Sequence, residues 1–158
     1  MTNPMFAPSG QIREVSGFEE FRVDGDMLFA RAIGATTLED VKRMFAINQG
    51  LYERYGYALV LIDGARASTT TPDARKYQSD LLRKRIFPSH TAIFGGGVLV
   101  RTTISLMMRA TELLTGTKIP VDMVADEQTA RTVLAAARER FAIQGIAKQP
   151  LDSIKQIK

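Results

Sequence analysis

Hydroxyl side chains gather in one stretch of the sequence, where Ser68, Thr69, Thr70 and Thr71 directly precede a predicted helix. A hydroxyl at the amino end of a helix can accept a phosphoryl group, and the added charge then lies against the positive end of the helix dipole. The same residue types also serve as helix caps and as solvated loop residues, and capping by Thr71 is the commoner use. The stretch is therefore a candidate phosphoacceptor or partner-binding loop, with capping as the simpler alternative.

A glycine turn, Gly95-Gly96-Gly97, lies between a predicted strand and a predicted helix. Backbone N–H groups at such a turn can hold a phosphate or carboxylate, and Arg101, about one helical turn later, could assist with an anion. The run matches neither the dinucleotide-binding fingerprint nor the P-loop, so close approach of helix and sheet is an alternative role for the glycines. Asp63 ends a predicted central strand, where open α/β sheets place active groups. An enzyme built from Asp63 and this turn would need a polar pocket that joins them.

Residues 98–114 form a predicted helix with more apolar side chains than one buried stripe requires. Val100, Ile104, Met107 and Met108 mark one side, and leucines mark much of the rest. A second apolar face indicates cover by a twin subunit, a protein partner or a lipid chain, and adjacent methionines suit adaptable surfaces. Deep burial of the helix in the core is the alternative. We take these four residues as candidate interface or lid residues.

The remaining titratable residues form no pattern typical of catalysis or of a metal site. The single histidine, His90, stands near no acid–nucleophile pattern and is expected at the entry to a strand. The chain has no cysteine, which excludes disulfides, thiolate zinc sites and thiol nucleophiles. Basic residues at 75–76 and 83–85 lack interleaved aromatic residues, so we expect a solvated helix face and no nucleic-acid partner. We expect no cofactor and no metal, and we favour a protein without enzymatic activity.

The composition is that of one folded domain. Of 158 residues, 45% are hydrophobic and 24% are charged, a balance that allows a buried core without metals or disulfides. The net charge of +4 permits an anionic partner without requiring one. No apolar run approaches the roughly 20 residues that span a bilayer, and the amino terminus lacks the pattern of a secretory signal. We therefore expect a protein that is not transmembrane and, since it lacks cysteine, a cytoplasmic one.

Periodicity and turn signals predict an antiparallel start followed by strands that alternate with helices. A capping box of Thr36 and Glu39 opens the first predicted helix, and Gly56 ends it. The next run, residues 57–62, is almost continuously apolar, which is typical of a central strand covered on both faces. The predicted strands are residues 11–15, 18–23, 27–33, 57–62, 91–94 and 121–125. The later predicted helices are residues 71–85, 98–114 and 126–141.

The element order is β-β-β-α-β-α-β-α-β-α, which predicts the α/β class. Strands that alternate with helices need crossover connections, so we expect a mainly parallel sheet with an antiparallel amino-terminal edge. We also expect a flexible lead over residues 1–10, one domain over residues 11–143 and a basic tail over residues 144–158.

Three features of this chain occur together in a known family. They are the element order, the central strand Leu59-Val60-Leu61-Ile62-Asp63, and the hydroxyl loop at residues 68–71 that opens a helix. With them the chain resembles STAS domains, the SpoIIAA-like family of anti-sigma-factor antagonists. The helix at residues 98–114 and the ending Met123-Val124-Ala125-Asp126-Glu127 are most similar to the bacterial branch grouped as STAS/CRAL-TRIO-like. The resemblance implies a SpoIIAA-like fold.

The resemblance also carries expectations about the site. In phosphorylated members of the family, the loop after the central strand holds the phosphate-accepting serine, and the matching region here is residues 68–71. This chain has Thr-Thr-Thr-Pro-Asp where that family has an Asp-Ser-Ser-Gly type of signature. The other branch implies a small lipid-binding fold in which an apolar helix forms a lid over the sheet.

Two functions from different classes follow. The first is a non-enzymatic regulatory protein–protein interaction module, working as a homodimer through the 68–71 loop, the start of the next helix and the helix at residues 98–114. The alternative is a small carrier of an apolar or acyl-chain ligand held under the helix at residues 98–114, which requires a real internal cavity.

Overall fold

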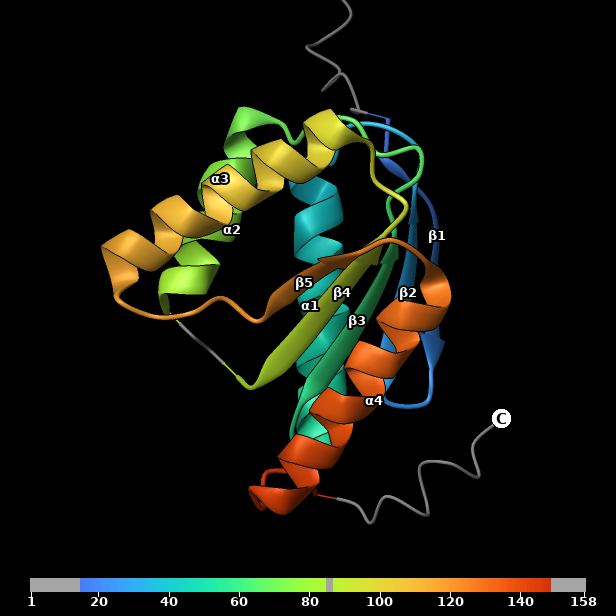
Figure 1. Ribbon diagram of the computed structural model, residues 1–158, viewed down its shortest axis with the longest axis vertical. Coiled ribbons are helices and arrows are strands. Elements are labelled where there is room, and N and C mark those ends of the chain that lie inside the picture. The colour runs from blue at the N-terminus through green and yellow to red at the C-terminus, as the bar shows by residue number, and fades with distance from the viewer. Residues whose placement is uncertain (1–14, 85–86, 149–158) are drawn as a thin grey trace, which may run out of the picture.

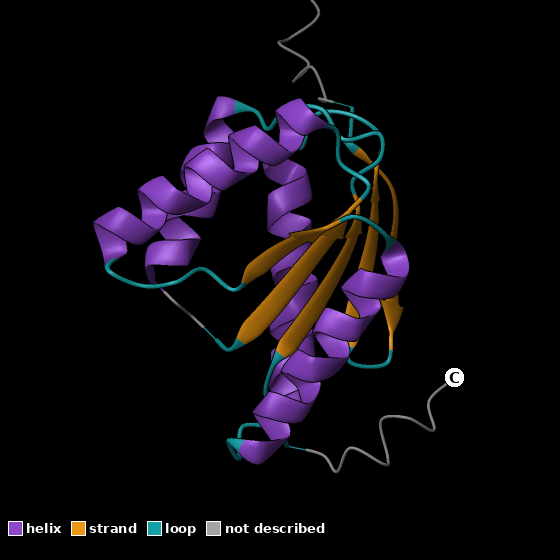
Figure 2. Ribbon diagram, in the orientation of Figure 1, coloured by secondary structure: helices purple, strands orange, loops and turns teal. Residues whose placement is uncertain are grey.

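Strands and helices alternate along the described part of the chain, residues 15–84 and 87–148 of a computed structural model (Figure 1). In chain order they are β1 (Phe18–Asp24), β2 (Met27–Ala32), α1 (Leu38–Tyr55), β3 (Ala58–Asp63), α2 (Pro72–Lys84), β4 (Ser89–Phe94), α3 (Val98–Thr115), β5 (Val121–Val124) and α4 (Glu127–Ile143). Figure 2 shows the same elements by type. The strand predicted at residues 11–15 lies outside the described residues except for Val15, which belongs to no strand.

The strands form one sheet in the order β1-β2-β3-β4-β5. β1 runs antiparallel to β2, and every later pair of neighbours is parallel. The predicted α/β class, with a mainly parallel sheet and an antiparallel amino-terminal edge, is therefore confirmed. Parallel neighbours cannot be joined by a tight turn, which is why a helix separates each pair. In Figure 1, α1 lies behind the sheet and α4 lies in front of it.

β3 lies at the centre of the core. Its residues Ala58, Leu59 and Leu61 are fully buried, and Val60 is 4% exposed. Successive side chains of a strand point to opposite faces, so an apolar run without polar alternation must be covered on both sides. α1 and α4 both contact β3 and provide this cover. The strand ends at Asp63 and brings that residue to the carboxyl edge of the sheet.

The first turn of α1 is capped by Thr37. The Thr37 hydroxyl accepts a hydrogen bond from the Asp40 backbone N–H at 3.2 Å, and the Asp40 carboxylate accepts one from the Thr37 N–H at 3.0 Å. The predicted box of Thr36 and Glu39 is therefore wrong by one residue. Thr36 precedes the helix because its backbone pairs with the 68–71 loop in an isolated parallel bridge. Asp40 also accepts from the Gly17 N–H at 2.8 Å, which ties the start of β1 to α1.

A buried ion pair anchors α4 to the sheet. Arg138 donates to both oxygens of the Asp26 carboxylate, at 2.7 and 2.8 Å, and the Tyr57 hydroxyl donates to the same carboxylate at 2.6 Å. Asp26 is 1% exposed, so these donors replace the water that it loses on folding. The hydrogen bond to Asp26 raises the pKa of Arg138. Burial, together with the neighbouring Asp26 carboxylate, raises the pKa of Tyr57.

The chain continues to pack after α4. Ile146 and Ala147 contact the core, and the Lys148 N–H donates to the Tyr55 carbonyl at 2.8 Å. Gly56 ends α1 with a φ of 89°, and a Cβ there would lie 2.2 Å from the Ile146 carbonyl oxygen. The left-handed backbone and the close approach both require glycine at this position. The packed region thus extends past residue 143, where we expected the domain to end.

Candidate functional site

The carboxyl edge of the parallel strands brings two predicted candidates together. β3 and β4 end side by side at Asp63 and Phe94, so the 64–71 loop and the glycine turn start from neighbouring positions. The Gly64 N–H donates to the Phe94 carbonyl at 2.8 Å. Gly95 has a φ of 75°, and a Cβ there would lie 3.3 Å from the Cβ of Ala65. The turn therefore lets two loops pack closely, a use of glycine that needs no bound anion.

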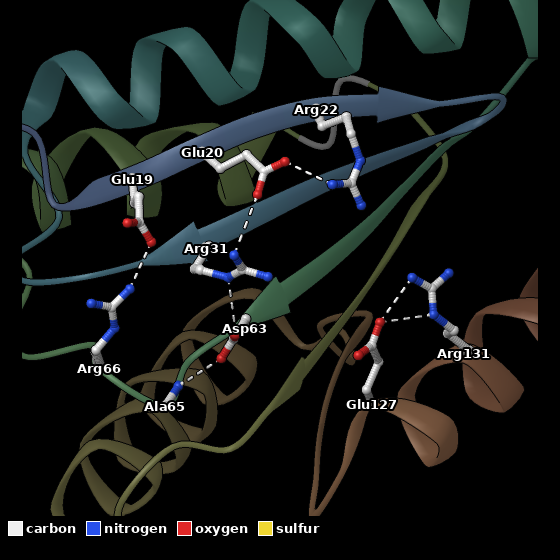
Figure 3. Close-up of polar contacts among 9 residues, drawn as sticks. All are labelled: Glu19, Glu20, Arg22, Arg31, Asp63, Ala65, Arg66, Glu127 and Arg131. Atoms are coloured by element: carbon white, nitrogen blue, oxygen red, sulfur yellow. Dashed lines mark hydrogen bonds and ion pairs between the residues drawn. The ribbon is translucent and has the colours of Figure 1, made fainter.

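The Asp63 carboxylate is engaged by its neighbours. Arg31 lies directly opposite Asp63 in the register of β2 and β3, and its Nε donates to one carboxylate oxygen at 3.3 Å. The Ala65 N–H donates to the other oxygen at 3.1 Å (Figure 3). Arg31 also pairs with Glu20 on β1 at 3.6 Å. Asp63 is thus one member of a cross-strand ion-pair network, and its described partners include neither the glycine turn nor Arg101.

The hydroxyl loop has a fixed backbone and exposed side chains. The Thr36 N–H donates to the Thr69 carbonyl at 2.9 Å, and the Thr71 N–H donates to the Thr36 carbonyl at 3.0 Å. Ser68 and Thr69 are exposed, while Thr70 and Thr71 are half-buried. A modifying enzyme or a partner can therefore reach Ser68 and Thr69 without unfolding the loop. Arg66, in the same loop, is tied to Glu19 of β1 at 2.6 Å (Figure 3).

The Thr71 hydroxyl acts as a donor. It donates to the Asp73 carboxylate at 2.5 Å, and that carboxylate accepts a second hydrogen bond from the Ala74 N–H at 2.8 Å. The Thr71 hydrogen bond is the main cause that lowers the pKa of Asp73. The sequence allowed Thr71 to cap the helix by accepting a backbone hydrogen bond. In the structure its hydroxyl instead donates to the Asp73 carboxylate.

α3 turns one apolar side toward the protein and another toward solvent. The predicted interface or lid residues, Val100, Ile104, Met107 and Met108, are half-buried. α3 also exposes five large apolar side chains: Val98 (83%), Leu99 (79%), Leu106 (61%), Leu113 (86%) and Leu114 (74%). Three of them, Leu99, Leu106 and Leu113, lie on the side opposite the half-buried residues. α3 packs against α2, and Figure 1 shows it beside that helix and away from the strands. We call Leu99, Thr103, Leu106, Ala110 and Leu113, all exposed, the outer stripe.

The spacing of the leucines in the sequence indicates the outer stripe. Leu99, Leu106 and Leu113 are spaced by seven residues, which keeps them on one face of a helix. Both apolar faces of the helix were recognisable, but which one faced outward depends on where α3 docks. That placement follows from contacts between α2 and α3, which periodicity does not encode.

A cavity of about 880 Å³, open to solvent and not enclosed, lies at the amino-terminal ends of β4 and β5. Its walls come from α1, α2, α3, α4 and the segments that lead into the two strands. The apolar part of the lining includes Phe45, Leu81, Leu82, Phe87, Ile119 and Phe141. Lys118 and Arg140 also line it, and no acidic residue is among the described lining residues. The Oδ1 atom of Asn48, another lining residue, is buried and has no hydrogen-bond partner within the described residues.

A polar cluster that the sequence did not predict positions Arg140 beside this cavity. Arg140 donates to Nδ1 of His90 at 3.2 Å, and Nε2 of His90 lies 2.7 Å from an Asp122 oxygen. Arginine can only donate, so we assign the ring proton to Nε2, which donates to Asp122. His90 is the second residue of β4 and is buried. The three residues come from distant parts of the sequence, so no local spacing could have indicated them.

Within residues 15–84 and 87–148, no group of three or more histidine and acidic side chains is placed to hold a metal ion. None of the helices within those ranges combines the length and apolar content that a membrane span requires.

Comparison with known proteins yields a similarity of fold. No family model and no curated protein matches this chain. Among solved structures, the chain is similar to an uncharacterised protein of the DUF3478 family with a SpoIIAA-like fold from Shewanella loihica PV-4. The two share 19% sequence identity and a TM-score of 0.49, over 78% of this chain and 98% of the other. The α/β architecture assigned to this chain rests on its own strand order.

Proposed function

We propose that the protein is a non-enzymatic regulatory module that binds another protein through the exposed side of α3. The observation that carries this proposal is the exposure of large apolar side chains there, from 61% at Leu106 to 86% at Leu113. Burying one such side chain stabilises a complex by about 1.5–3 kcal/mol. Contiguous exposed apolar side chains on a folded domain mark interaction sites, whereas single ones are ordinary. A chain without cysteine suits a reducing compartment, so we propose that the module acts in the cytoplasm.

The hydroxyl loop is the proposed place of regulation. Ser68 and Thr69 are exposed beside the amino end of α2, and their backbone is held by Gly34 and Thr36, respectively. A phosphoryl group on either would add about −1.5 to −2 charges to this edge. The added charge would favour partners that present arginine or lysine and would repel acidic ones. Replacement of both residues by alanine should leave the fold intact and remove any phosphate-dependent change in partner binding.

The interaction surface can be tested by site-specific photo-crosslinking in living cells. Leu113 and Ile143 are both 86% exposed, and they lie on different helices, α3 and α4. A photoreactive phenylalanine analogue at position 113 should yield a discrete protein adduct, and the same analogue at position 143 should not. The adduct at 113 should weaken when Leu106→Ser is added, because Leu106 belongs to the same surface. Equal adducts at both positions would contradict the proposal.

A second candidate function is supported by the cavity. A volume of about 880 Å³ lies within the range of about 300–1,000 Å³ that is usual for small-molecule sites. The apolar lining suits an acyl chain or another apolar body. Lys118 and Arg140, in the absence of acidic lining residues among those described, favour an acidic head group. On this proposal the protein is a small carrier, and α3 contributes Thr111 and Thr115 to one wall.

The carrier proposal predicts a co-purified ligand. Native mass spectrometry of the purified protein should show a mass above 17.5 kDa per chain that dissociates on denaturation. Thr115→Trp should obstruct the cavity beside α3 and reduce this extra mass. Thr132→Trp, at an exposed position of α4, is the matched control and should retain it. The absence of any extra mass from protein expressed in several hosts would reject the carrier, and so would a ligand that Thr115→Trp leaves in place.

A further inference from the structure

The outer stripe of α3 has the spacing of a helix-pairing seam. Leu99, Thr103, Leu106, Ala110 and Leu113 follow one another at steps of four, three, four and three residues. This is the spacing of the two apolar positions in a heptad, and it keeps all five residues on one face along about 21 Å of helix. The two stripe residues that alternate with the leucines, Thr103 and Ala110, have small side chains. A second helix can therefore approach closely at Thr103 and Ala110 while leucines fill the space on either side.

The stripe is complementary to itself when it is reversed. Leu106 stands midway between Leu99 and Leu113, seven residues from each. A two-fold axis that passes beside Leu106 places Leu106 against its own copy and Leu99 against the second copy's Leu113. The same operation places Thr103 near the second copy's Ala110. Such an interface uses one patch on both subunits, as closed two-fold dimers do.

Charge at the ends of α3 favours the reversed arrangement. The first turn of α3 contains no acidic residue, the last turn contains no basic residue, and the amino-terminal cap, Gly97, makes no side-chain hydrogen bond. The positive and negative ends of the helix dipole are thus left without the side chains that usually balance them. An antiparallel second α3 brings its negative end beside the positive end of the first. A parallel second α3 would bring like ends together.

We propose that the outer stripe binds the outer stripe of a second copy of this chain, antiparallel, with the two-fold axis at Leu106. This inference rests on the proposed function, because it names the protein that occupies the exposed side of α3. Two helices of this length bury less than the roughly 1,200 Å² that stable complexes need. The dimer should therefore dissociate on dilution and be sensitive to single substitutions in the stripe.

The lack of cysteine makes the geometry directly testable, because any disulfide must come from an introduced residue. Helices packed about 8–10 Å apart bring facing Cα atoms about 4–5 Å from each other, which allows a disulfide. Leu106→Cys should therefore form a covalent homodimer under mild oxidation, about tenfold or more faster than Ile143→Cys. Ile143 is the more exposed of the two positions, so this control does not favour the predicted result. Leu99→Cys alone should stay at the control rate, since its two copies lie about 21 Å apart. An equimolar mixture of Leu99→Cys with Leu113→Cys should link at about half the rate of Leu106→Cys, because about half of its pairs contain one of each variant.

Each other outcome is decisive. Self-linking of Leu99→Cys as fast as Leu106→Cys would overturn the antiparallel arrangement, because a parallel pair aligns equal residues. Linking of Leu106→Cys at only the control rate would overturn the dimer, and so would a wild-type mass of 17.5 kDa by light scattering at every concentration. If no link forms and the photo-crosslink at position 113 still captures a different protein, the interaction module stands and the second copy is excluded as its partner. If neither forms, both proposals fail.

Discussion

At the scale of single residues, the direction of a hydrogen bond decides what a side chain can do. The stretch from Thr71 to Asp73 has the letters of a helix start, and α2 does begin at Pro72. The letters do not say whether the Thr71 hydroxyl accepts from the backbone or donates to a carboxylate. Asp73 already accepts from the Ala74 N–H, which the cap would otherwise use, so the hydroxyl is left to donate. Ser68 and Thr69 are the exposed hydroxyls of this loop, and any modification would have to act there.

The Thr71–Asp73 pair predicts a specific pH dependence. Thr71→Val removes the main cause that lowers the pKa of Asp73, so this pKa should rise toward its usual value of about 3.9. Because the folded-state pKa is lowered, the pair stabilises the fold above the unfolded-state pKa and loses that effect as the pH falls through the folded-state value. NMR titration of the Asp73 side-chain carbon measures the change. Thr132→Val, on the exposed side of α4, is a control that should leave Asp73 unchanged, and an unaltered Asp73 in Thr71→Val would contradict the hydrogen bond.

At the scale of elements, periodic segments were predictable and caps were less so. The helices over residues 71–85, 98–114 and 126–141 match α2, α3 and α4 closely, because each buries or exposes whole faces that recur with the helical period. Asp126 caps α4 as predicted, accepting from the Thr129 N–H at 2.8 Å. The cap of α1 is displaced by one residue because Thr36 is held by the 68–71 loop, which is distant in the sequence. The local sequence around Thr36 does not indicate a contact with residues more than 30 positions away.

The attachment of α4 to the sheet allows a matched comparison of two arginines on one helix. Arg138 pairs with Asp26, whose side chain is 2% exposed, and Arg131 pairs with Glu127, whose side chain is 49% exposed (Figure 3 shows the second pair). Arg138→Met should lower the free energy of unfolding by about 3–5 kcal/mol, because it leaves a buried carboxylate without its cation. Arg131→Met should change it by about 0–1 kcal/mol, since water screens the exposed pair.

Urea unfolding of both variants measures this difference. Asp26→Asn combined with Arg138→Met should cost less than the two single changes added together, because the double variant leaves no unpaired charge. Equal losses for Arg138→Met and Arg131→Met would show that the buried pair does not hold α4.

At the scale of the whole molecule, the architecture was predictable and its surfaces were not. The unbroken apolar run that became β3 requires cover on both faces, and this requirement alone indicates a parallel sheet between helices. The cavity, the His90–Asp122–Arg140 cluster and the outward face of α3 arise where elements far apart in sequence meet. They depend on which elements lie against one another, which hydrophobic spacing does not fix. The joining of Asp63 to Arg31 is likewise a matter of strand register.

The packed segment after α4 predicts where the domain can be cut. Removal of residues 144–158 takes away Ile146, Ala147 and the Lys148 bond to Tyr55, whereas removal of residues 149–158 keeps all three. Half burial of the Ile146 side chain contributes about 1 kcal/mol, and the smaller Ala147 side chain contributes less. The longer deletion should therefore lower the midpoint of thermal unfolding by several degrees relative to the shorter one. Differential scanning fluorimetry compares the two, and equal midpoints would place the end of the domain at residue 143.

The strand order β1-β2-β3-β4-β5 makes the order in space the same as the order of synthesis. Each new strand emerges from the ribosome beside a neighbour that is already in place, so sheet assembly needs few contacts between distant parts of the chain. The second face of the sheet is covered later, because α4, which packs on it, is the last element of the chain. Leu134 and Phe141 of α4 arrive only after every strand has been made, and until then one side of the growing sheet has no helix over it. A nascent chain halted before α4 would therefore display an apolar sheet face, the feature by which chaperones recognise incomplete proteins.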